Sequence, residues 1–101
     1  MINKISPTNT NFKAELWPYP HTCPDKEIGQ MFREQTKDFP EYILMQDDIS
    51  FAEKDFFVLF KKNRNQSVAR GWYEFTSNHL NTKKTIVNRF VEIFNSLIKM
   101  R

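Results

Sequence analysis

The chain has 101 residues, of which 40% are hydrophobic and 15% aromatic, and its net charge is +3. This length fits one domain, and the apolar content excludes a chain that is disordered throughout. The single cysteine excludes an internal disulfide, and no apolar run approaches the roughly 20 residues of a membrane-spanning helix.

The N-terminal part of the chain predicts an arm followed by a short strand. Residues 1–11 are polar and show no periodicity, so we expect a flexible arm there and a single domain over residues 12–101. In "FKAELW", Phe12–Trp17, apolar and polar residues alternate, which predicts a strand. Three prolines in "PYPHTCP" then predict an extended connector.

The first helix is predicted to begin near Pro24, because proline suits a first helical turn. Thr22 or Cys23 would then cap it. The segment "DFP" predicts that this helix ends at Asp38 or Phe39.

The middle of the chain predicts three strands. The first is Glu41–Gln46, which the turn residues Asp47 and Asp48 would end, and the following "SFAEK" predicts no single structure. Asp55–Lys62 holds five consecutive apolar residues, which indicates a central strand covered on both faces or exposed only at its ends. "VARGWYEFTS", residues 68–77, alternates and would form an antiparallel hairpin with the strand before it.

The last helix is predicted from about Thr82, its cap, to Met100. Its broad apolar face, at helical spacing, consists of Ile86, Val87, Phe90, Val91, Ile93, Phe94, Leu97 and Ile98. The order strand, helix, three strands, helix (β-α-β-β-β-α) predicts the α+β class. We expect a three- to four-stranded antiparallel sheet with two helices packed on one face.

Two motifs carry a resemblance to a known family. "FPEYILMQ" opens the first of three consecutive strands with Pro-x-Tyr, and "TKKTIVNRFVEIF" opens the last helix with two lysines. From residue 24 onward, these motifs and the element order resemble the double-stranded-RNA-binding domain, whose last helix aims a lysine cluster at phosphates across the RNA major groove. The resemblance implies RNA contacts by Lys83 and Lys84, with Arg89 as a companion. The chain departs from the family at the acidic loop "DDISFAEK", which lacks its usual histidine, and at Val87, where the family continues its lysine cluster.

The charge is unevenly distributed along the chain. Residues 1–60 hold six Lys/Arg and ten Asp/Glu, whereas residues 61–101 hold nine and two. Either the second half forms a basic face, or the fold mixes the halves and the charges largely cancel.

A candidate partner-binding site lies on the last strand. If Tyr73 and Phe75 belong to the core, alternation places Trp72 and Arg70 on the opposite face, where a Trp beside an Arg is typical of an interaction hot spot. The alternative is a Trp72 covered by the N-terminal strand. Further basic candidates for partner contacts are Lys61, Lys62 and Arg64.

Residue patterns typical of catalysis or metal binding are not found. His21 and Cys23 are two residues apart and His79 is distant, whereas a zinc site needs more ligands at a recognisable spacing. With only two glycines the chain has no Gly-rich phosphate loop. We therefore expect no enzyme, no cofactor and no metal.

These features favour a small, non-catalytic protein that docks on another protein and blocks it, as inhibitors, immunity proteins and phage counter-defence proteins do. The alternative is an RNA- or DNA-binding protein that uses the lysines of the last helix. A third reading is a small ribonuclease-type toxin with His79 as the base. The N-terminal "MINKISPTNT" has no apolar run, so a cytoplasmic location is expected.

Overall fold

A computed structural model describes residues 13–19, 25–63, 66–75 and 81–101 of the chain. Its elements, in order, are β1 (Glu15–Trp17), α2 (Lys26–Gln35), β2 (Tyr42–Phe51), β3 (Lys54–Lys61), β4 (Gln66–Glu74) and α3 (Lys83–Met100). This order confirms the predicted α+β class and the β-α-β-β-β-α sequence of elements. The predicted arm, residues 1–11, lies outside the described residues.

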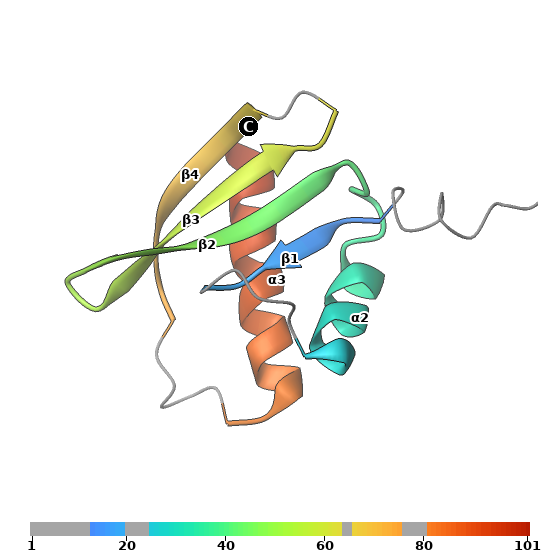
Figure 1. The fold of residues 1–101 in the computed structure, drawn as a ribbon, viewed down its shortest axis with the longest axis horizontal. Helices are drawn as coiled ribbons and strands as arrows, with labels where there is room; N and C mark the ends of the chain where they lie inside the picture. The colour runs from blue at the N-terminus through green and yellow to red at the C-terminus, as the bar shows by residue number, and fades with distance from the viewer. Residues whose placement is uncertain (1–12, 20–24, 64–65, 76–80) are drawn as a thin grey trace, which may run out of the picture.

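The four strands form one sheet in the order β1-β2-β3-β4. β2, β3 and β4 pair antiparallel, as predicted, but β1 pairs parallel with β2. The sheet is therefore mixed and not antiparallel throughout. The parallel pair follows from the connection, because α2 crosses from β1 back to β2 and both strands then run in the same direction (Figure 1).

The hairpin between β2 and β3 differs from the sequence prediction. Asp47 and Asp48 do not end β2, which continues to Phe51. The turn lies at Ala52 and Glu53, whose φ angles of 53° and 61° are both positive. Two-residue hairpin loops of this type match the twist of the strands, but they normally use Asn and Gly. No residue here indicates such a turn, since neither Ala nor Glu favours positive φ.

Both helices begin at a side-chain cap. The carboxylate of Asp25 accepts hydrogen bonds from the backbone N–H groups of Glu27 and Ile28, so Asp25 is the cap of α2. The helix begins at Lys26, two residues after Pro24, near the predicted start. Thr22 and Cys23, the predicted caps, lie outside the described residues. α2 ends at Gln35, before the predicted Asp38 or Phe39, and the backbone N–H of Thr36 donates to Phe32.

α3 begins as predicted. The hydroxyl of Thr82 accepts from the N–H of Thr85, and the hydroxyl of Thr85 accepts from the N–H of Thr82, a reciprocal capping box. The predicted apolar face of α3 is buried or packs against the core. No helix among the described residues is long and apolar enough to cross a membrane.

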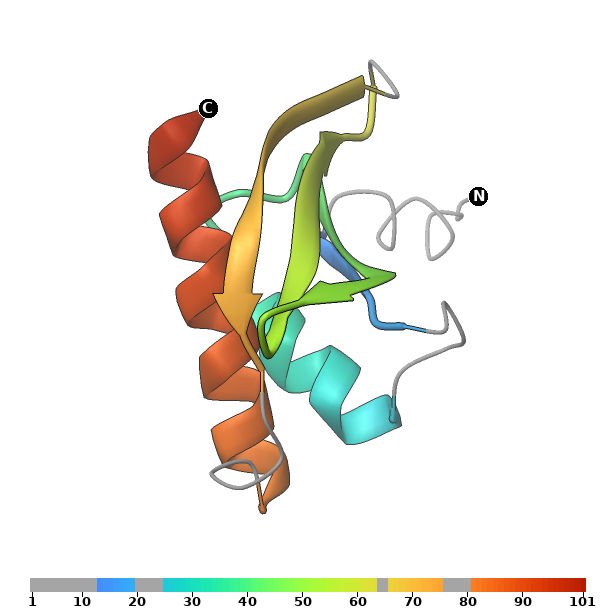
Figure 2. The same ribbon diagram turned by 90° about the vertical axis from the view of Figure 1, so that its left-hand side faces the viewer.

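One hydrophobic core lies between the helices and the sheet (Figure 2). The ring of Phe94, on α3, is fully buried and contacts Phe32 of α2, Phe39, and Tyr42 of β2, at centroid distances of 5.5, 6.2 and 6.5 Å. Leu44 of β2 and Phe57 and Leu59 of β3 complete the buried layer from the sheet. We call the face of the sheet that carries this layer the inner face, and the opposite face the outer face.

We predict that a glycine-containing turn stabilises the hairpin. Replacing Ala52→Asn and Glu53→Gly together should raise the free energy of unfolding by about 1 kcal/mol, because left-handed backbone costs Ala and Glu more than Asn and Gly. Urea unfolding measures this as a higher midpoint at an unchanged slope. Glu41→Gly is the matched control. Glu41 is exposed and does not have a positive φ, so glycine there should lower stability by roughly 0.5–1 kcal/mol. Equal effects at both sites would contradict the prediction.

Candidate protein-binding surface

The outer face of the sheet carries a second set of large apolar side chains. Successive residues of a strand point to opposite faces, so the residues that alternate with the buried ones point outward. The pairing of the strands aligns one row of them across the sheet: Trp17 of β1, Met45 of β2, Val58 of β3 and Arg70 of β4. The apolar members of this row are not part of the helix-side core.

The five-residue apolar run of β3 is explained by this arrangement. β3 is a central strand, as predicted. Phe57 and Leu59 are buried under the helices, whereas Phe56 and Phe60 lie on the outer face and are half-buried. Among the residues that the structure describes, neighbouring strands rather than a third helix surround the outward-facing side chains. Val58 is nearly as buried as the core.

Three aromatic side chains form a cluster on this face, which we call the aromatic cluster: Phe51, Phe56 and Trp72. The Trp72 ring lies 5.0 Å from Phe56 and 6.3 Å from Phe51, measured between centroids. Trp72 is 42% exposed and Phe51 74%. The ring contacts hold Trp72 in place while leaving much of its surface free. Such a side chain loses little conformational freedom on binding.

Phe51 was missed by the sequence prediction because that prediction ended β2 at Gln46. The ladder between β2 and β3 shifts by two residues between Gln46 and Ser50, and it resumes with Ser50 opposite Asp55 and Phe51 opposite Lys54. This irregularity bends the strand, as bulges do, and it lets Phe51 approach Trp72. The available signal was the alternation of Ile49 and Phe51 with polar Asp48 and Ser50.

The structure brings some of the predicted partner-binding residues together and separates others. Trp72 and Arg70 share the outer face of β4, as the alternation predicted. Lys61 is the last residue of β3 and Lys62 follows it, five and six residues beyond Phe56, the cross-strand partner of Trp72. At about 3.3 Å per residue this places them roughly 16–20 Å away along the strand. Arg64 lies outside the described residues.

Lys62 serves a structural purpose at the edge of the sheet. Its ammonium group lies 3.1 Å from the carboxylate of Glu15 on β1 and donates a hydrogen bond to the carbonyl oxygen of Lys13. β1 has only three residues. Lys62 therefore ties this short strand to the end of β3.

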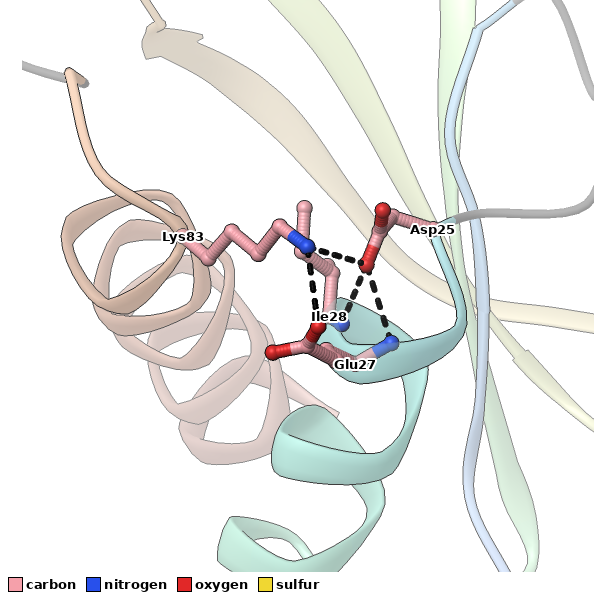
Figure 3. A network of polar contacts seen from close by, with 4 residues as sticks. All are labelled: Asp25, Glu27, Ile28 and Lys83. Carbon is pink, nitrogen blue, oxygen red and sulfur yellow. Dashed lines mark hydrogen bonds and ion pairs between the residues drawn. The ribbon is translucent and has the colours of Figure 1, made fainter.

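Lys83, one of the two lysines at the start of α3, joins the two helices (Figure 3). Its Nζ lies 3.3 Å from Asp25 and 3.1 Å from Glu27, both at the start of α2. Hydrogen bonds to Glu27 and Asp25 raise the pKa of Lys83. Desolvation acts to raise the pKa of Asp25, but the N–H groups of Glu27 and Ile28 and the ammonium of Lys83 outweigh it, so the pKa of Asp25 is lowered. We call this contact the Lys83 clamp.

The other nucleic-acid candidates have different surroundings. Arg89 donates from Nε to the carbonyl oxygen of Glu74 at 2.8 Å, and its guanidinium lies 3.3 Å from Glu92. Lys84 is exposed and forms no ion pair within the described part of the chain. Lys83 and Arg89 therefore have protein partners, and Lys84 remains open to solvent.

A basic hollow that the sequence did not indicate lies beside α2. Its volume is about 410 Å³, and its lining residues are Lys13, Gln30, Arg33, Glu34 and Lys37. Three cations face one carboxylate there. Arg33 and Lys37 are four residues apart, with Glu34 between them, and Lys13 comes from a distant part of the sequence, so no run of like charges indicated this hollow.

The residues considered for catalysis, His21, Cys23 and His79, lie outside the described residues. Among the described residues, no three His, Cys, Asp or Glu side chains gather closely enough to hold a metal ion. Comparison of the chain with protein-family models, curated proteins and solved structures finds no match.

The Lys83 clamp predicts a pH-dependent contribution to stability. Because the pKa of Lys83 is raised in the folded state, its contribution is fully present below about pH 10 and is lost as the pH rises further. Because the pKa of Asp25 is lowered, its contribution is present above about pH 4 and is lost as the pH falls further. Lys83→Met should therefore lower Tm most at neutral pH, with the difference from the wild type shrinking at both extremes.

Thermal unfolding followed by circular dichroism across this pH range measures the effect. Lys84→Met is the matched control, since it removes the same charge from the same helix end without breaking an ion pair. It should leave Tm unchanged or raise it slightly, because a cation opposes the helix dipole there. Equal losses in both variants would show that the clamp contributes nothing specific.

Proposed function

We propose that the protein acts without catalysis, by docking on another protein through the outer face of its sheet and covering that partner's working surface. The observation that carries this proposal is the aromatic cluster, with Trp72 and Phe51 exposed by 42% and 74%. Trp17, on β1 of the same face, is also 43% exposed. Exposed aromatic side chains gathered on one face mark interaction surfaces more often than scattered ones do.

The charges around this face indicate the chemistry of the partner. Arg70 and Lys54 contribute positive charge to the outer face, and Glu15 and Glu74 contribute negative charge. A rim of both signs around an apolar centre is typical of protein–protein interfaces. The matching partner surface is an apolar patch bordered by charges of both signs, which would orient the complex more than tighten it.

Fold and charge also bear on the RNA-binding alternative. From α2 to α3 the element order is the one that resembles the double-stranded-RNA-binding domain. Phosphate contacts supply most of the affinity of such domains, and Lys83 and Arg89 already contact carboxylates of this chain. These contacts favour the protein-docking proposal.

The single cysteine, Cys23, is consistent with a reducing cytoplasm as the place of action.

The test is capture of a partner from lysate of the native cell by tagged wild-type protein and variants, followed by affinity measurement with the captured partner. Trp72→Ala should weaken binding by tenfold or more, the loss expected for a buried aromatic anchor. Met100→Ala is the control, because Met100 is also exposed, by 60%, but lies on α3. Circular dichroism of each variant would show whether its fold is intact.

Salt and nuclease separate the two proposals. A protein complex through the outer face should survive nuclease treatment and lose little affinity between 50 and 200 mM salt. Nucleic-acid binding should fall by orders of magnitude over that range, and Lys84→Ala should weaken it. Co-purification of nucleic acid alone, with no effect of Trp72→Ala, would sink the protein-docking proposal.

A further inference from the structure

β4 is an end strand of the sheet, and the direction of its backbone groups follows from the ladder. The N–H of Lys62 donates to the carbonyl of Glu41. This bond shows which residue pairs of the ladder between β2 and β3 are hydrogen-bonded pairs and which are not. Hydrogen-bonded and non-hydrogen-bonded pairs alternate along an antiparallel ladder. Counting from Lys62, Phe60 and Val58 therefore point their N–H and C=O groups toward β2. The intervening residues of β3, Phe57 and Leu59, must therefore point theirs toward β4.

The same alternation continues into β4. Phe57 pairs with Gly71 and Leu59 with Ala69. The N–H and C=O groups of Gly71 and Ala69 therefore point toward β3 and hydrogen-bond to it. Arg70, Trp72 and Glu74 then point their N–H and C=O groups away from the sheet. The bond from Arg89 to the carbonyl of Glu74 agrees with this assignment, because it reaches that carbonyl from outside the ladder.

Within the part of the chain that the structure describes, this edge is unpaired and has little of the protection that edge strands usually have. The 66–74 segment contains no proline, and the segment from Arg70 to Glu74 pairs with β3 without a register shift. Arg89 occupies one carbonyl at its end, but a carbonyl oxygen has two lone pairs and can accept a second bond. The edge can therefore template another strand.

The side chains that accompany the free backbone groups are self-complementary. Arg70, Trp72 and Glu74 are exposed on the outer face. Within the described residues neither Arg70 nor the Glu74 side chain forms an ion pair. If two copies of β4 run antiparallel with Trp72 opposite Trp72, the Arg70 of each copy lies opposite the Glu74 of the other.

We propose that the chain forms a symmetric homodimer in which the two β4 edges pair antiparallel, centred on Trp72. Other registers satisfy the side chains less well. A dimer centred on Arg70 would place the two Arg70 side chains opposite each other and would include Val68, where the ladder with β3 shifts register. A dimer centred on Gly71 would place the charged Glu74 opposite the apolar Val68. Centring on Trp72 pairs both charges twice, and all three residues point their backbone groups at the partner strand.

The dimer would join the two sheets edge to edge, with both helix layers on the same side. The aromatic clusters of the two copies then adjoin across the symmetry axis and form one outer face. This inference does not rest on the proposed docking function. Dimerisation is measured on the purified chain alone, so either proposal can fail without the other.

The test is sedimentation equilibrium, with light scattering, of the purified wild-type chain and charge variants over a range of concentrations. The wild type should show twice the mass of one chain at high concentration. Arg70→Glu alone and Glu74→Arg alone should each raise the dimer Kd by about tenfold, because each sets like charges opposite each other twice. The double variant Arg70→Glu/Glu74→Arg should restore the wild-type Kd.

Lys99→Glu is the control, since Lys99 is exposed on α3 and should leave the Kd unchanged. A second measurement reports the register. Trp72→Cys in a Cys23→Ser background should form a disulfide between copies on mild oxidation, because residues opposite each other in such a ladder have Cα atoms about 5.5 Å apart. Ser67→Cys in the same background should not.

Three results would overturn the proposal. The first is a wild-type chain that stays monomeric at every concentration reached. The second is a dimer whose Kd neither single reversal changes. The third is a pair of single reversals that weaken the dimer without rescue in the double variant, which would exclude the Arg70–Glu74 pairing.

Discussion

Burial of one face of α3, centred on Phe94, is the constraint on which the rest of the fold depends. Phe94 contacts aromatic rings from α2, from the segment after it and from β2, so a single side chain connects three parts of the chain. α2 has ten residues, and helices of that length are marginal in isolation. Its position is therefore set by packing, through the fully buried Phe32, and the Lys83 clamp adds a polar contact at the same helix pair.

Placing both helices on the inner face has a consequence for the outer face. β3 is central and apolar on both sides, so its outward residues must be covered by side chains of the neighbouring strands. The strands cover Val58 almost completely but leave Trp72 and Phe51 largely exposed. The candidate binding surface thus follows from the absence of a helix on the outer face among the described residues, whereas the edge of β4 follows from its position at the end of the sheet.

Local signals in the sequence predicted the parts of the fold that local interactions determine. The Thr82 cap, the apolar stripe of α3 and the central position of β3 are of this kind, and the structure confirms them. The Ala52–Glu53 turn was missed because neither residue favours positive φ. The parallel pairing of β1 with β2 was missed because the relative direction of two strands depends on the path of the chain between them, here through α2. Alternation placed Trp72 and Arg70 correctly on the outer face. Phe51 was missed because the turn residues Asp47 and Asp48 predict the end of β2, although Ile49 and Phe51 alternate with polar residues beyond them.

The distribution of charge illustrates how folding changes what a sequence suggests. The acidic first half and the basic second half are brought together, since Glu15 pairs with Lys62 and the carboxylates at the start of α2 pair with Lys83. Folding thereby neutralises part of the expected basic face. Oppositely charged Arg70 and Glu74, four residues apart on one strand, are exposed and form no ion pair with the residues that the structure describes. Because that spacing is symmetric about Trp72, the second copy of the strand in the proposed dimer would place a partner opposite each charge.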